Sequence, residues 1–222
     1  MVVRCATAAI VVARSQAAMV GLLWHCGSAK IGLVPQQPPA PLDKLLTLAQ
    51  GYADFAMRNI GHVPPALLAD SPKGVIQFVP ASFKDERAKD NFANAARLIC
   101  LGYEVTAAVL VLEAWIKVAK PGERLDLTEL PSEAFDRREV VVLTGETAKQ
   151  SVQRLLPIIR TEACAFFGLG EHEGPDLDKF EGRFAHLIPP RRPNAENREM
   201  ARALLAAMGV TEDRLWGNAG WN

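Results

Sequence analysis

The chain has 222 residues, of which 49% are apolar and 23% charged, and its 25 basic and 25 acidic residues give a formal net charge of zero. A chain of this length can bury a hydrophobic core without help from a metal or a disulfide. Dedicated nucleic-acid-binding proteins usually carry a basic surplus, so the neutral charge argues against a nucleic-acid partner. The four cysteines include no CxxC pair, which is typical of free thiols in a reducing, cytoplasmic compartment and not of a zinc site.

Residues 1–33 form an apolar N-terminal extension that Arg14-Ser15-Gln16 interrupts. Its uninterrupted apolar runs are too short to cross a bilayer, and an internal arginine is unlike a secretory signal. Three interpretations stay open: an amphipathic helix that packs on the domain or a partner, a signal or anchor, and a stretch translated from a start codon too far upstream. Length and charge favour the first and third, so we expect no membrane association.

A proline-rich linker at residues 34–41 precedes the expected core domain, residues 42–170. Its first element is a helix over 42–60, where apolar residues recur at helical spacing. A strand over 75–79 and a helix over 83–101 follow. The charged residues at the start of that second helix, Lys89 among them, are expected to face water.

The longest apolar stretch, Val105 to Lys117, predicts an interior strand of an antiparallel sheet. Its even positions are almost entirely apolar and should pack against the preceding helix. Its odd positions are apolar up to Val111 and then carry Glu113, Trp115 and Lys117. The apolar part of this odd face needs a cover, either another element of the chain or a second copy of it.

Three further strands are expected over residues 139–144, 151–160 and 164–169, with Pro157 placing the middle one at an edge or a bulge. Short turns between successive strands imply antiparallel pairing. The predicted fold class is therefore α+β, an antiparallel meander of about four to five strands with helices packed on one face. Residues 171–222 are expected to form a helical extension, with a short helix within 174–188 and a longer one over 195–208.

The odd face of the central strand is the first candidate site. Glu113, Trp115 and Lys117 point the same way, about 6.5–7 Å apart in succession. A carboxylate beside an indole can have a raised pKa, which suits a general acid. The alternative is that Glu113 pairs with Lys117 or with an arginine of the next strand.

The connector before the next strand is the second candidate site. It holds Glu133, Asp136, Arg137 and Arg138. Two adjacent arginines could bind a phosphate or carboxylate, and the two acids could assist Glu113 in catalysis. The alternative is a solvated loop whose charges pair locally.

No recognised nucleotide-binding, hydrolase or metalloprotease motif is present, and we expect no metal and no cofactor. Two functions stay open. One is a small interaction module that forms a homo-oligomer or binds a protein partner. The other is a hydrolase- or nuclease-like enzyme that uses Glu113 together with the connector from Glu133 to Arg138.

Four segments carry a resemblance to known sequences: residues 85–90, 111–115, 131–140 and 156–160. Through them the chain resembles a set of uncharacterised bacterial and phage-associated proteins. The likeness covers residues 42–170 and leaves out the first 33, as an over-long start would. That group has no assigned activity, so the resemblance implies a domain boundary and not a function.

Overall fold

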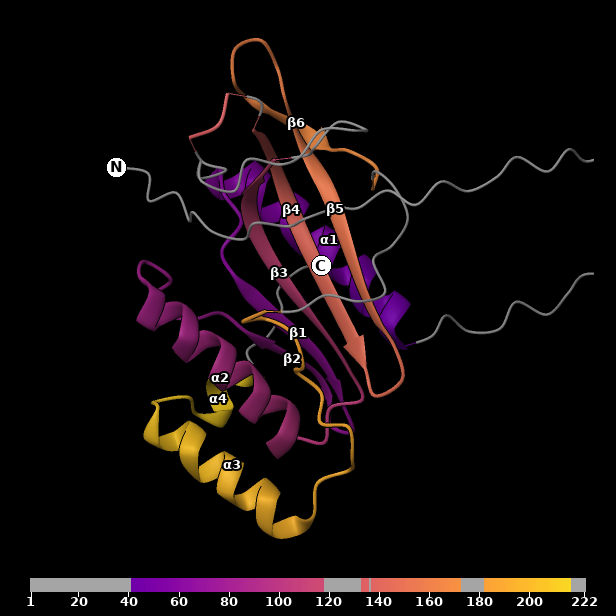
Figure 1. Ribbon diagram of the computed structural model, residues 1–222, viewed down its shortest axis with the longest axis vertical. Coiled ribbons are helices and arrows are strands. Elements are labelled where there is room, and N and C mark those ends of the chain that lie inside the picture. Colours follow the sequence, from indigo (N-terminus) through magenta and orange to yellow (C-terminus); the bar gives the residue numbers. More distant parts are fainter. Residues whose placement is uncertain (1–40, 118–132, 136, 173–181, 217–222) are drawn as a thin grey trace, which may run out of the picture.

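The computed structural model of the protein describes residues 41–117, 133–135, 137–172 and 182–216. A six-stranded antiparallel sheet in the order β2-β1-β3-β4-β5-β6 forms its centre (Figure 1). The elements in chain order are α1 (Pro41–Ile60), β1 (Ala66–Ser71), β2 (Gly74–Phe78), α2 (Glu86–Gly102), β3 (Ala107–Ile116), β4 (Arg138–Thr147), β5 (Ser151–Arg160), β6 (Phe166–Leu169), α3 (Ala195–Ala207) and α4 (Glu212–Leu215).

The α+β class and the antiparallel pairing are confirmed, with six strands in place of four or five. The additional strand is β1, which lies between β2 and β3. It escapes prediction because both of its faces are largely buried, so the short run after Pro64-Pro65 shows no polar alternation.

Helix α1 covers the odd face of β3. Its buried stripe, which includes Leu46 and Ala53, shares one hydrophobic cluster with Val109 and Val111 of β3 and Leu143 of β4. The cover of the odd face is therefore α1 of the same chain. Because α1 occupies it, the apolar part of the odd face is not a surface for a second copy.

Helix α2 covers the even face, as the pattern of β3 predicts. Phe92 and Ile99 of α2 lie in a second cluster with Ala108 and Leu110 of β3. The C-terminal part of the chain completes this cluster through Leu187, Leu205, Val210 and Leu215. Helices thus pack on both faces, which corrects the expectation of one covered face (Figure 1).

One local expectation is wrong, and a second can be compared with the structure only over residues 182–188. Lys89 is buried, with 5% of its surface exposed, because it lies on the sheet-facing side of α2 and pairs with Glu86. Residues 182–188 form a turn and irregular chain and no helix, while residues 173–181 lie outside the described part. Within these described residues, Phe184 and Leu187 of the expected apolar side pack against α2 and the sheet.

Pro157 lies in β5, an interior strand, just before the point where β6 begins to pair with it. It pairs with Val140 of β4, while β6 begins to pair with β5 at Ile158, and a register shift follows at Ile159 and Arg160. Proline has no N–H to donate, so it fits a position where the neighbouring strand ends. Among the described helices, none is both long and apolar enough to cross a bilayer.

Candidate functional site

The register of β3 and β4 assembles a polar group at the far end of the odd face, beyond the end of α1. Glu113 lies opposite Val141, and Trp115 lies opposite Glu139. Glu113 and Glu139 are therefore diagonal neighbours on one face of adjacent strands. We call Glu113, Trp115 and Glu139, with Arg137 and Arg160 that contact them, the polar end.

Glu113 is half-buried and holds the chain just after α1. Its Oε2 accepts a hydrogen bond from the backbone N–H of Val63, at 2.8 Å. Burial raises the pKa of Glu113 above its ordinary value, and the nearby charge of Glu139 adds to the rise. The hydrogen bond from Val63 and the charges of His62 and Arg160 act in the opposite direction. A raised pKa suits a proton donor, but one carboxylate oxygen already serves the backbone.

Arg160 of β5 pairs with Glu139 and not with Glu113. Its guanidinium donates to both carboxylate oxygens of Glu139, at 2.7 and 2.9 Å. Such a two-pronged pair fixes both side chains more firmly than a single contact. This arginine comes from β5, which is separated from β3 by β4, and it neutralises Glu139. No pairing of Glu113 with an arginine of the next strand is therefore observed among the described residues.

The two adjacent arginines of the connector point to different places. The guanidinium of Arg137 lies over the ring of Trp115, with Cζ 4.8 Å from the ring centroid, a cation–π contact. Arg138 is exposed and pairs with Ile116 in the sheet register, so it belongs to the opposite face from Glu113. The two side chains therefore leave the chain toward different faces of the sheet.

The remaining predicted site residues are more dispersed. Lys117 is half-exposed just after β3, and Glu133 is exposed in the turn before β4. Asp136 lies outside the described residues. Within the described part of the chain, no group of three or more histidine, cysteine or carboxylate side chains is placed to hold a metal ion.

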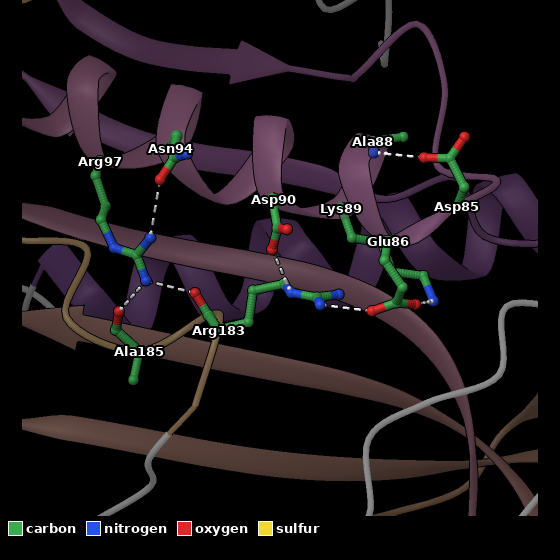
Figure 2. Close-up of polar contacts among 9 residues, drawn as sticks. All are labelled: Asp85, Glu86, Ala88, Lys89, Asp90, Asn94, Arg97, Arg183 and Ala185. Atoms are coloured by element: carbon green, nitrogen blue, oxygen red, sulfur yellow. Dashed lines mark hydrogen bonds and ion pairs between the residues drawn. The ribbon is translucent and has the colours of Figure 1, made fainter.

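A second polar group, absent from the sequence prediction, joins α2 to residues 183–185 (Figure 2). Arg183 contacts Glu86 at 2.5 Å and Asp90 at 2.8 Å, and Glu86 also accepts from Lys89 at 2.7 Å. The hydrogen bonds from Lys89 and Arg183 lower the pKa of Glu86. The partners are almost a hundred residues apart, a separation that local sequence patterns do not reveal.

Glu146, at the end of β4, is a buried carboxylate with three backbone donors. It accepts the N–H groups of His186 at 2.8 Å, Leu187 at 2.7 Å and Ile188 at 3.4 Å. Only 6% of its surface is exposed. One sequence signal could have found it, because Glu146 continues the buried even face of β4 and a carboxylate there needs partners.

Helix α3 presents the most regular exposed apolar row of the described helices. Met200 and Leu204 of α3 and Met208, the C-cap residue that follows it, lie about one turn apart and are 59%, 47% and 41% exposed. The adjacent side of the helix, about 100° further round, buries Ala201 and Leu205 against α2 and its neighbours. We call Met200, Leu204 and Met208 the α3 stripe.

Comparison with known proteins identifies no relative: no family model, curated protein or solved structure matches the chain.

Proposed function

We propose that the protein is an interaction module that associates with a second copy of itself through the α3 stripe. The observation that carries this proposal is the row of three large apolar side chains on the outward side of α3. Exposed apolar patches on soluble domains commonly mark contact sites for proteins. Methionine suits such a surface because its flexible, polarizable side chain adapts to a partner.

The spacing of the stripe makes it complementary to itself. In an antiparallel pairing of two α3 helices, a two-fold axis near Leu204 places Met200 of one copy opposite Met208 of the other. A formal net charge of zero leaves little long-range repulsion between copies. The patch is small, so the expected association is weak and depends on protein concentration.

The polar end offers less support for the alternative of a hydrolase- or nuclease-like enzyme. Glu113 serves the backbone of Val63, and Glu139 is neutralised by Arg160. Arg137 rests on Trp115. These contacts tie the elements of the fold together, which is a sufficient reason for these residue types at these positions.

Sedimentation velocity over a wide range of protein concentration tests the proposal. We expect the sedimentation coefficient of the wild type to rise with concentration and that of Leu204→Lys to stay at the monomer value. The matched control is Leu48→Lys, since Leu48 is an exposed leucine on α1 with 41% of its surface accessible. A wild type that stays monomeric throughout, or a Leu204→Lys variant that associates equally well, would overturn the proposal.

A further inference from the structure

Residues 182–188, which we call the arm, are held through their backbone groups to α2 and the sheet, which we call the body of the protein. The arm is neither helix nor strand, and it contains a turn closed by the hydrogen bond from Ala185 N–H to the carbonyl of Gly182, at 3.2 Å. His186 has a positive φ of 59°. Backbone groups of such a segment find no partners in a regular ladder, so the body must supply them.

Two side chains of the body bind the backbone of the arm. Arg97 of α2 donates to the carbonyl oxygens of Arg183 and, at 3.0 Å, of Ala185 (Figure 2). From the sheet, Glu146 accepts the N–H groups of residues 186–188. A guanidinium that binds carbonyls and a carboxylate that binds N–H groups contact atoms that every peptide has. This part of the contact is therefore independent of the side chains of the arm.

Three side chains of the arm add selectivity. The ring of Phe184 lies among aromatic rings, 6.0 Å from that of Phe83 and 6.2 Å from that of Phe92 between centroids. Leu187, three residues later, is 1% exposed within the even-face cluster. Just before them, Arg183 meets the carboxylates of Glu86 and Asp90.

We propose that Arg97, Glu146 and the pockets for Phe184 and Leu187 form a binding groove for linear peptide segments, and that the arm is its built-in ligand. The partner is a protein segment with a basic residue, an aromatic residue next to it and an aliphatic residue three positions further on. Charge supports this occupant, because Glu86 and Asp90 flank the position of the basic residue. The arm competes with the partner within the same chain, so binding in trans requires the arm to leave the groove.

The test uses a labelled peptide with the sequence of residues 182–188 and the full-length chain. Fluorescence anisotropy compares wild type with the Phe184→Ala/Leu187→Ala variant, whose weakened arm leaves the groove open. We expect the variant to bind the peptide at least about tenfold more tightly than wild type. Adding Glu146→Gln to the variant should weaken this binding, and a peptide of scrambled sequence should not bind. A folded variant that does not bind the peptide, or binding that ignores Glu146→Gln, would overturn the proposal.

A measurement on the unchanged chain covers the case in which the double variant fails to fold. Hydrogen exchange of the amides of residues 186–188 is followed with and without excess peptide. Displacement of the arm predicts that the peptide accelerates exchange at these amides and leaves the amides of β3 and β4 unchanged. Identical exchange under both conditions would contradict a groove that accepts a second peptide.

Discussion

The carboxylate of Glu113 and the backbone N–H of Val63 are joined by a 2.8 Å hydrogen bond that fixes the chain where it leaves α1 for β1. This contact accounts for a polar side chain in an otherwise apolar strand. The position of Glu113 is partly buried, and this burial is the main reason that the pKa of its carboxyl group is raised. The ionised form of Glu113 is therefore less stable in the folded protein than in water.

The first prediction concerns the pH dependence of stability. A folded-state pKa above the unfolded value means that Glu113 contributes stability at acidic pH that is lost as pH rises through the folded pKa. Glu113→Gln keeps an oxygen for Val63 and removes the titration. Relative to the variant, wild type should lose stability as pH rises from the ordinary carboxyl range to neutrality, in urea unfolding at a series of pH values. A constant difference, or one of opposite slope, would contradict the assignment.

The hydrogen bond itself can be separated from the charge. Glu113→Ala leaves the Val63 N–H without its partner, which should cost about 1–2 kcal/mol in the free energy of unfolding at neutral pH. Glu113→Gln should cost less at the same pH. Equal losses in the two variants would mean that the hydrogen bond from Val63 N–H to the side-chain oxygen at position 113 contributes nothing to stability.

The second prediction concerns Glu146, which accepts three backbone N–H groups in a buried place. Glu146→Ala should lower the free energy of unfolding by about 2–4 kcal/mol, and Glu146→Gln by about 1–2 kcal/mol, since an amide oxygen accepts more weakly than a carboxylate. Chemical denaturation measures both. Glu162→Gln, at an exposed turn position, is the control and should change little. An unchanged Glu146→Ala protein would show that these bonds do not stabilise the fold.

The third prediction concerns the close approach of α1 to β4. A Cβ added to Gly145 would lie 2.9 Å from Cδ1 of Leu42 and 3.0 Å from Cγ1 of Val152. Both neighbours are side chains packed in the odd-face cluster, so Gly145→Ala should cost about 1–3 kcal/mol through overpacking. Gly168→Ala in β6 is the matched control, because nothing lies within 4 Å of its added Cβ. Thermal unfolding should separate the two variants clearly, and an equally stable Gly145→Ala would contradict this packing.

The hydrophobic pattern of β3 predicts which of its residues are buried on each face of the sheet. Alternation along Ala107 to Ile116 divides the strand into two faces, and each face packs as its residues require. On the odd face, the pattern also distinguishes the apolar half up to Val111 from the polar positions that begin at Glu113. The pattern could not say what covers the odd face, because α1 reaches it from more than forty residues earlier in the chain.

The contacts of the polar residues were harder to foresee, since each depends on register or on distant segments. Arg160 could have paired with either carboxylate, and the sheet register gives it to Glu139. The charged neighbours of Lys89 predict that it faces water, whereas the orientation of α2 buries it. Glu146 finds its donors about forty residues later.

Cross-linking at the proposed two-fold axis tests self-association through the α3 stripe most directly. Leu204→Cys is prepared with Cys5, Cys26 and Cys164 replaced by serine, and Leu48→Cys in the same background is the control. Antiparallel pairing of two α3 helices predicts that mild oxidation converts Leu204→Cys into a disulfide-linked dimer, because the two positions meet at the axis. Leu48→Cys should stay monomeric. Equal cross-linking of both variants, or none in Leu204→Cys, would contradict self-association through α3.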